Sequence, residues 1–269
     1  MTGNKSNSLL LTPRDLLLFR ALWAAKLLDR EQICQVARFD SVTRANERLF
    51  RLHTAGFLHR YFLGTRAGGR KAIYGLSLRG ARMISESKVW RLQRAEDELL
   101  VGEAFVEHQL AVNWCWISMF HELVSDAASF RRFQDPISPA ILLSPDGYAE
   151  LKTPNGAQPV FLEVDLGNET STVWLRKVGL YLKLATSGEF QQRFQQSRFK
   201  VAIVCTSERR QQSLRRTIKT QTNKLFYFST LSTIQSEGFT APHWLRADGD
   251  QREAIAERNL CASAPTAKS

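Results

Sequence analysis

Apolar and polar positions follow two different periods along this chain. In residues 12–54, apolar side chains recur every three to four residues in three short segments, which predicts three helices. Two apolar and aromatic runs, 57–63 and 71–78, predict strands, and the connection between them is rich in Gly and Arg. The first part of the chain therefore reads as three helices followed by a β-hairpin.

The middle of the chain follows the strand period. Runs at 148–151 and 160–166 flank Asn155 and Gly156, a pair that favours a hairpin because its turn requires positive φ. The second run is apolar at alternate positions. Glu163 and Asp165 therefore lie together on its opposite face.

Three acids meet in this predicted hairpin. Burying Glu163 and Asp165 in a core-like strand is costly unless a partner neutralises them. Asp146 opens the first arm of the same hairpin, so we expect it to lie across from them. Carboxylates that converge in this way predict a hard-cation site for Mg²⁺ or Mn²⁺, with all three acids as ligands. A surface hairpin with a few solvated acids is the alternative interpretation.

A helix predicted at about 170–186 directly follows the acidic strand. Lys177 and Tyr181 are four residues apart, so they share a face of that helix, and this face can look back at the carboxylates. An ordinary solvated lysine is the alternative reading of Lys177.

The second half of the chain completes an alternating α/β pattern. A long helix is predicted at 90–116, a buried strand at 199–205, a strongly basic helix from 207 and a last strand at 225–228. Residues 1–11 and 238–269 read as a terminal arm and a polar tail. The predicted domains are thus 12–88 and 89–237.

Charge is unevenly distributed between these domains. The chain has 269 residues, 43% of them hydrophobic, and a net charge of +11. Residues 1–90 hold 16 Lys and Arg against 6 Asp and Glu, a net charge of +10. A localised basic excess indicates a polyanionic partner, most often nucleic acid. The four scattered cysteines form no zinc or disulfide pattern.

Three helices followed by a basic hairpin are typical of a winged helix-turn-helix, which predicts double-stranded DNA as the partner. The third helix would enter the major groove, and the hairpin would contact phosphates. A winged helix used only for protein contacts is the alternative. The candidate DNA-binding residues are Arg44, Asn46, Arg48 and Arg51 on the third helix and Arg66, Arg70 and Lys71 on the hairpin.

Two motifs carry a family resemblance. Pro145-Asp146 followed by Glu163-Val164-Asp165 resembles the PD-(D/E)xK nuclease pattern, although Asp165 stands where that pattern has its lysine. Some members of that superfamily carry the lysine on the next helix, where Lys177 is the candidate.

The same motifs, with R-K-V-G-L-Y on the following helix, resemble the replication-relaxation family of plasmid and mobile-element proteins. The resemblance implies a mixed α/β protein, with a winged helix-turn-helix followed by a restriction-endonuclease-like domain. It also implies a catalytic set of Asp146, Glu163, Asp165 and Lys177, with Mg²⁺ or Mn²⁺ as the cofactor and the Val164 carbonyl completing the metal site.

Two functional hypotheses follow. One is a DNA-binding protein of plasmid replication or relaxation that nicks DNA with a divalent metal. The other is a transcription or replication-control factor whose nuclease-like domain is inactive and which forms a homodimer. No signal peptide, lipidation motif or long uncharged apolar segment is present in this sequence, so both hypotheses expect a cytoplasmic protein without a membrane partner.

Overall fold

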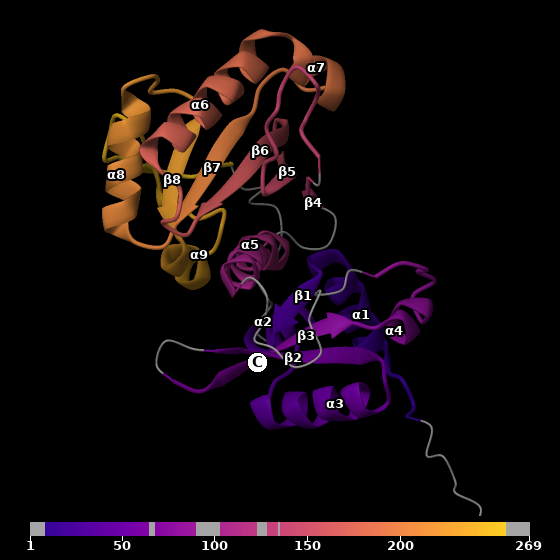
Figure 1. The fold of residues 1–269 in the computed structure, drawn as a ribbon. Helices are drawn as coiled ribbons and strands as arrows, with labels where there is room; N and C mark the ends of the chain where they lie inside the picture. The colour runs from indigo at the N-terminus through magenta and orange to yellow at the C-terminus, as the bar shows by residue number, and fades with distance from the viewer. Residues whose placement is uncertain (1–8, 65–67, 90–102, 123–127, 134, 257–269) are drawn as a thin grey trace, which may run out of the picture. The chain divides into compact units, whose positions relative to one another are not determined.

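The computed structural model describes residues 9–64, 68–89, 103–122, 128–133 and 135–256. The chain divides into two compact units, Met1–Asn113 and Trp114–Ser269 (Figure 1). Each unit has its own sheet, one with three strands and one with seven. The predicted mixed α/β fold is confirmed.

The first unit contains the three predicted helices, each with the expected N-cap. Thr12 and Asp29 form capping boxes at the first two, and Ser41 caps the third. Their bounds are α1 Pro13–Ala25, α2 Arg30–Val36 and α3 Val42–Thr54.

The hairpin of this unit consists of β2 (Leu58–Gly64) and β3 (Arg70–Leu76), followed by the short helix α4 (Leu78–Arg82). A strand that the sequence did not predict, β1 (Leu27–Asp29), pairs antiparallel with β3 and gives the order β1-β3-β2. Its three residues are too few to display a period, so the pattern alone could not identify it.

Helix α5 (Glu103–Glu122) contains the division between the two units. Its first half belongs to the first unit: Gln32 Nε2 donates to the carbonyl of Leu110, and Asn113 Nδ2 donates to the carbonyl of Leu27. The sequence had placed the domain boundary near residue 88, before this helix. Part of the helix predicted at 90–116 lies outside the described residues.

The second unit is built on a mixed sheet with the order β10-β9-β8-β7-β6-β5-β4. Strands β6, β7 and β8 are parallel, and the neighbours on both sides are antiparallel. The strands are β4 Ala128–Arg131, β5 Gly147–Thr153, β6 Gly156–Asp165, β7 Lys200–Cys205, β8 Phe226–Thr230, β9 Trp244–Arg246 and β10 Arg252–Glu253.

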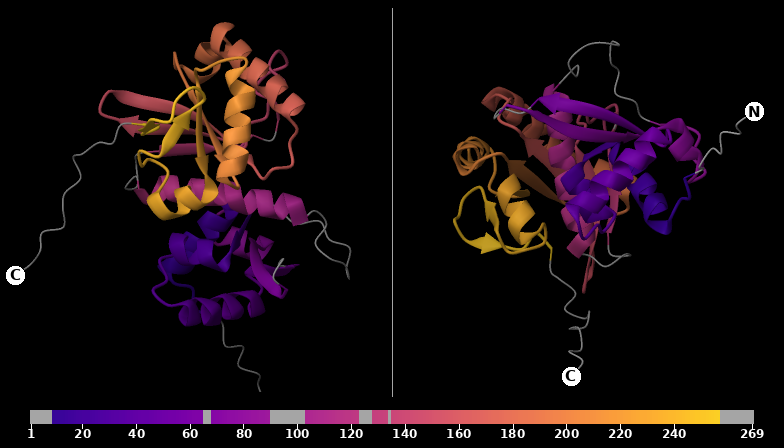
Figure 2. Two further views of the ribbon diagram at one scale, coloured as in Figure 1. Left: turned by 90° about the vertical axis from the view of Figure 1, so that its left-hand side faces the viewer. Right: turned by 90° about the horizontal axis from the view of Figure 1, so that it is seen from below.

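Three helices cover one face of this sheet (Figures 1 and 2). They are α6 Ser171–Thr186, α7 Glu189–Phe194 and α8 Glu208–Lys219, and their buried side chains share one core with alternate residues of β6, β7 and β8. Phe161, in this core, contacts six other aromatic rings among the described residues, those of Phe133, Tyr148, Tyr181, Phe190, Phe194 and Phe199.

Two segments differ from the sequence prediction. The Gln-rich stretch 188–197, predicted as a loop, contains α7, because Phe190 and Phe194 supply two apolar anchors one turn apart. β8 is followed by α9 (Leu231–Glu237), and the segment from 238 on, predicted as a polar tail, begins with fully buried Phe239 and with Trp244, the fully buried first residue of β9. Among the described residues, no helix combines the length and the apolar character needed to cross a bilayer.

Candidate functional site

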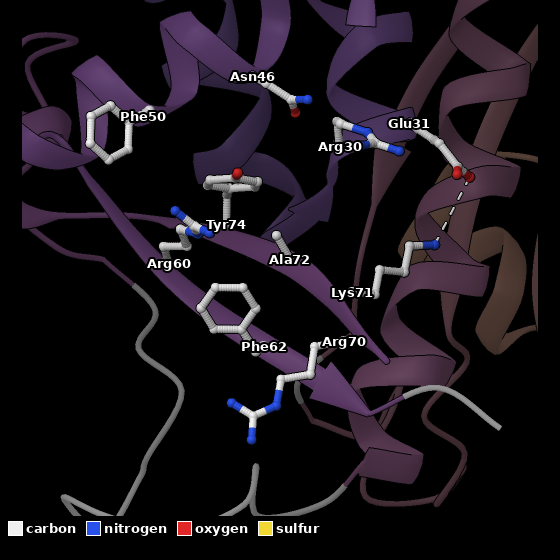
Figure 3. A pocket seen from close by; sticks show the side chains of 10 residues that line it. All are labelled: Arg30, Glu31, Asn46, Phe50, Arg60, Phe62, Arg70, Lys71, Ala72 and Tyr74. Atoms are coloured by element: carbon white, nitrogen blue, oxygen red, sulfur yellow. Dashed lines mark ion pairs between the residues drawn. The ribbon is translucent and has the colours of Figure 1, made fainter. Parts of the chain in front are cut away.

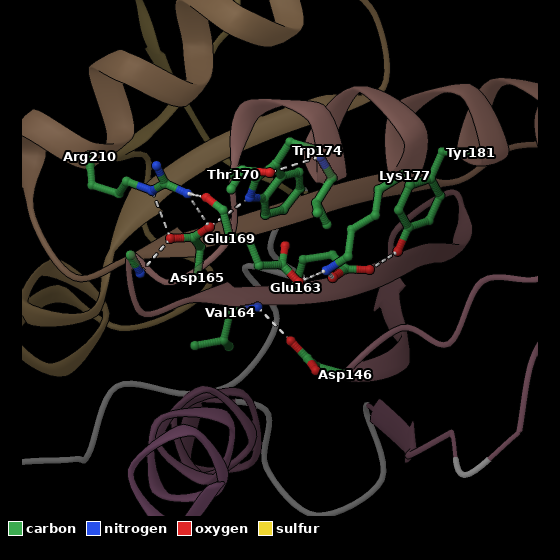
Figure 4. A network of polar contacts seen from close by, with 12 residues as sticks. Asp146, Glu163, Val164, Asp165, Glu169, Thr170, Trp174, Lys177, Tyr181 and Arg210 are labelled. Carbon is green, nitrogen blue, oxygen red and sulfur yellow. Dashed lines mark hydrogen bonds and ion pairs between the residues drawn. The ribbon is translucent and has the colours of Figure 1, made fainter. Parts of the chain in front are cut away.

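The predicted hairpin of β5 and β6 places two acids on the face of the sheet that α6 covers. Within the hairpin, Gly147 of β5 pairs with Leu162 of β6. On the other edge of β6, Glu163 and Asp165 pair with Ile203 and Cys205 of β7, which belong to the buried core. Both carboxylates are almost completely buried. Burial of this kind requires hydrogen-bond partners, and each acid has its own set (Figure 4).

Glu163 is held by two side chains of α6. Lys177 Nζ lies 2.9 Å from Glu163 Oε2, and the Tyr181 hydroxyl donates to Oε1 at 2.6 Å. Burial raises the pKa of Glu163 to about 7; the nearby Lys177 ammonium opposes this rise, and the negative charge of Asp146 adds to it. Lys177 and Tyr181 therefore share the helix face that their spacing predicts.

Asp146 ends the loop before β5 and is half-buried. Its Oδ2 accepts the main-chain N–H of Val164 at 2.7 Å, so its carboxylate lies beside β6 where β5 has not yet begun. A second cation lies near it. Burial lowers the pKa of the Arg132 guanidinium to about 10, and the negative charge of Asp146 works against that shift.

Lys177 bridges two carboxylates. Its Nζ lies 2.8 Å from Glu169 Oε1 as well as contacting Glu163, and it stands 4.9 Å from the centre of the Trp174 ring. Burial alone would lower the pKa of Lys177, but the charge of Glu163 and the hydrogen bonds to both acids raise it. The sequence reading missed Glu169, which lies in the turn before α6 without a strand or helix period to identify it.

Asp165 belongs to a separate cluster. Arg210 of α8 binds it with two parallel hydrogen bonds of 2.8 Å, and Trp174 Nε1 and the Gly167 N–H also donate to it. Burial alone would raise the pKa of Asp165, but these hydrogen bonds outweigh it and lower the pKa. The basic pattern of α8 was visible in the sequence, but which of its arginines points at the sheet was not.

The structure therefore sorts the four predicted site residues into two groups. Asp146, Glu163 and Lys177 gather at the start of β5, whereas the two oxygens of Asp165 are occupied by Arg210, Trp174 and Gly167. Over the described part of the chain, no group of three or more His, Cys, Asp or Glu side chains is arranged to hold a metal ion. Both oxygens of Glu163 are bonded as well, to Lys177 and Tyr181, but Glu163 differs from Asp165 in lying close enough to Asp146 to feel its charge.

The candidate DNA-binding residues of the first unit also divide. Arg44, Asn46, Arg51 and Arg70 are exposed, while Arg66 lies outside the described residues.

Arg48 and Lys71 point to acids of their own unit. Arg48 forms an ion pair with Asp15, the buried capping residue of α1, and Lys71 Nζ lies 2.6 Å from Asp29 Oδ2 at the start of α2. Arg48 is half-buried rather than exposed, because position 48 follows buried Ala45 by three residues and lies at the edge of the inner stripe.

Comparison with known proteins gives three results. No curated protein matches this chain significantly. The restriction endonuclease FokI, solved alone, aligns with a TM-score of 0.34 and 12% identity over 82% of this chain and 43% of that one. The same enzyme bound to DNA aligns with a TM-score of 0.30 and 12% identity over 85% and 44%. This chain thus spans less than half the length of FokI, and scores this low carry no functional conclusion.

The third result is a family match. The model of the replication-relaxation family matches residues 19–196, from α1 through the candidate site to the segment after α7. The match includes the hairpin of the first unit, Asp146, Glu163 and Lys177, and it supports a role in DNA processing. On this ground, the chain belongs to the replication-relaxation family.

Proposed function

We propose that this protein binds double-stranded DNA through its first unit and cleaves one strand through its second. The observation that carries the second half is the grouping of Asp146, Glu163 and Lys177: an acid just before the first strand of a hairpin, an acid on its second strand and a lysine from the next helix. The net charge of +10 in residues 1–90 supports the first half.

Duplex binding is assigned to the exposed face of α3 and to the hairpin. Arg44, Asn46 and Arg51 are exposed on α3, which has the length and position of a helix that enters a major groove. Arg70 at the start of β3 would contact phosphate. Arg48 is excluded from this set because its charge is neutralised by Asp15.

The donor chemistry of the second unit fits a divalent cation. Asp146 and Glu163 carry oxygen ligands, which Mg²⁺ and Mn²⁺ prefer, and their mutual repulsion contributes to the raised pKa of Glu163. These two residues would hold the ion, with the main-chain carbonyl of Val164 as a further ligand. A bound divalent cation would supply an activated water and stabilise charge on a phosphate.

The remaining groups position this pair. The Tyr181 hydroxyl fixes one oxygen of Glu163, and Lys177 holds the other from between Glu163 and Glu169. Such a lysine is placed to stabilise the extra negative charge of a phosphodiester transition state. Asp165, bound on both oxygens, has a structural role in this proposal.

Incubation of supercoiled plasmid DNA with Mg²⁺ or Mn²⁺ tests this assignment. We expect the wild type to produce nicked circles, and Asp146→Asn and Glu163→Gln to reduce the rate by at least about 100-fold, the scale on which single charge-stabilising groups act. Matched controls are Asp250→Asn and Glu189→Gln, the same changes at acids paired on the surface of this unit. Nicking that survives in both site variants would reject the assignment.

The runner-up is a replication- or transcription-control protein without nuclease activity that dimerises through its second unit. One observation favours it: Asp165 and Arg210 form a closed ion pair at the position where the nuclease pattern has its lysine. Such a protein would bind duplex DNA and leave it intact with either metal. Specific binding without any nicked product across a metal titration would select this alternative.

A further inference from the structure

The first unit contains a groove that shares Asn46 and Arg70 with the proposed duplex-binding surface but also presents exposed aromatic rings, which duplex binding does not explain. It lies among α2, α3 and the hairpin and has a volume of about 570 Å³, within the range of small-molecule sites (Figure 3). Its walls carry four cationic side chains and one acid, Glu31. The cations are Arg30, Arg60, Arg70 and Lys71.

The three arginines of the groove form no ion pairs with described residues of the protein. Over the described residues, no acid lies within ion-pairing distance of Arg30, Arg60 or Arg70, and the Nε atoms of Arg30 and Arg60 are buried without a hydrogen-bond partner. Lys71, by contrast, is held by Asp29. The groove therefore presents an uncompensated positive charge, which is complementary to phosphate.

Arg30, Arg60 and Tyr74 line the same groove. Figure 3 shows the Tyr74 ring in the middle of the groove, with Arg60 on one side and Arg30 on the other. Burial raises the pKa of Tyr74, and the charges of Arg60 and Arg30 act against that rise, as expected for cations close to the hydroxyl. The groove is thus lined by the Tyr74 hydroxyl and by the cationic side chains of Arg30 and Arg60.

Two phenylalanines are exposed at the same groove. Phe50 of α3 is 59% exposed and Phe62 of β2 is 38% exposed, although a phenylalanine is ordinarily buried. The Arg60 guanidinium carbon lies 4.6 Å from the centre of the Phe62 ring. Exposed aromatic rings beside planar cations are the surface on which nucleobases stack. The bases of an intact duplex offer no free faces to such rings, whereas an unpaired base does.

We propose that this groove binds an unstacked nucleotide of single-stranded DNA, with the base against Phe50 and Phe62 and its phosphates at Arg30, Arg60 and Arg70. This inference rests on the proposed DNA-binding function and adds a second binding mode to it. A protein that opens or nicks a duplex would use such a site to hold the displaced strand.

Fluorescence anisotropy with three labelled probes tests the groove: an oligothymidine, an abasic strand of the same length with the same phosphates, and a duplex. The wild type should bind the oligothymidine at least about fivefold more tightly than the abasic strand, since each stacked base contributes on this scale. Phe50→Ala combined with Phe62→Ala should remove that preference and leave abasic binding unchanged.

Two controls separate stacking from charge. Phe105→Ala removes an exposed ring on α5 that does not line the groove and should keep the preference. Arg44→Ala removes a cation outside the groove, so it should keep the ratio of oligothymidine to abasic binding.

The outcomes are distinguishable. Equal wild-type affinity for the intact and abasic strands, with duplex binding present, would overturn the groove assignment and leave the proposed function standing. Failure to bind any of the three probes would overturn both. An oligouridine of the same length that displaces the DNA strand at lower concentration would overturn the assignment to DNA. The first comparison needs no variant, so it holds even if the double substitution unfolds.

Discussion

Two acids only two residues apart on β6, Glu163 and Asp165, have pKa values shifted in opposite directions. Asp165 receives four hydrogen bonds, and its pKa is lowered; Glu163 is buried beside a second negative charge, and its pKa is raised to about 7. The difference comes from their donors, because Arg210 presents two parallel N–H groups and Lys177 divides its charge between Glu163 and Glu169. At residue scale, Glu163 is therefore the acid whose protonation can change near neutral pH.

Replacing Glu163 by Gln should change how stability depends on pH. The pKa of Glu163 is about 7 in the folded protein and has its ordinary value of 4.5 in the unfolded chain. Ionisation of Glu163 therefore opposes folding as the pH rises from about 4.5 to about 7. We expect the unfolding free energy of the wild type to fall relative to that of Glu163→Gln between pH 4.5 and pH 7. Above pH 7, the difference between the two unfolding free energies should stay constant. Urea unfolding at a series of pH values measures this.

The matched control for that series is Glu189→Gln, the same chemical change at an acid of α7 in a surface pair with Arg193. A wild-type curve that stays parallel to Glu163→Gln from pH 4.5 to 7 would contradict the raised pKa.

At the scale of elements, the Asp165 cluster joins three of them. Arg210 of α8 reaches the end of β6, and Trp174 of α6 donates to the same carboxylate. Asp165, at the carboxyl end of a strand with a parallel neighbour, is thus the point where α6 and α8 are fixed to the sheet. The Lys177 cluster sits one helical turn further along α6 and depends on the same placement of that helix.

Arg210→Ala should therefore destabilise the second unit strongly. Removal of the guanidinium leaves a buried carboxylate without its cation, a change that typically costs about 3–5 kcal/mol. Arg209→Ala, at the exposed neighbouring position of α8, is the matched control and should be close to neutral. Chemical denaturation measures both, and similar midpoints for the two variants would contradict the role of Arg210 as a structural cation.

Sequence patterns predicted those elements that carry a period or a cap. The helices capped by Thr12, Asp29, Ser41, Thr170 and Ser207 and the hairpin around Gly156 were identifiable because local chemistry determines them. Short pieces were missed, since β1 and β9 have three residues each and gain stability only from pairing with distant strands. For the same reason, the site partners Glu169, Arg210 and Arg132 were not identifiable, because tertiary packing alone selects them.

At the scale of the whole molecule, charge and acidity are segregated. Nearly all of the net charge of +11 resides in residues 1–90, whereas the buried carboxylates of the candidate site belong to the second unit. Under the proposed function, this division gives the attraction of DNA to the first unit and the phosphodiester chemistry to the second. The first unit should therefore set the salt dependence of DNA binding.

Removing two exposed cations of α3 tests this division. The double variant Arg44→Ala and Arg51→Ala should lower the slope of log affinity against log salt by about 0.9 for each lost phosphate contact on duplex DNA. Arg198→Ala, an exposed arginine of the second unit, is the control and should leave the slope unchanged. Mobility-shift titrations at several salt concentrations measure these slopes. An equal loss in all variants would contradict the assignment of binding to the first unit.

The hydrogen bond from the Val164 N–H to Asp146 has a practical consequence. β6 runs beyond the point where β5 begins, and a carboxylate takes the place of the missing ladder acceptor there. The amide proton of Val164 is therefore a natural spectroscopic probe: its resonance and its exchange with deuterated solvent respond whenever that carboxylate turns toward another partner. Binding of an ion or a phosphate at the site can therefore be detected from the Val164 amide resonance without any cleavage of DNA.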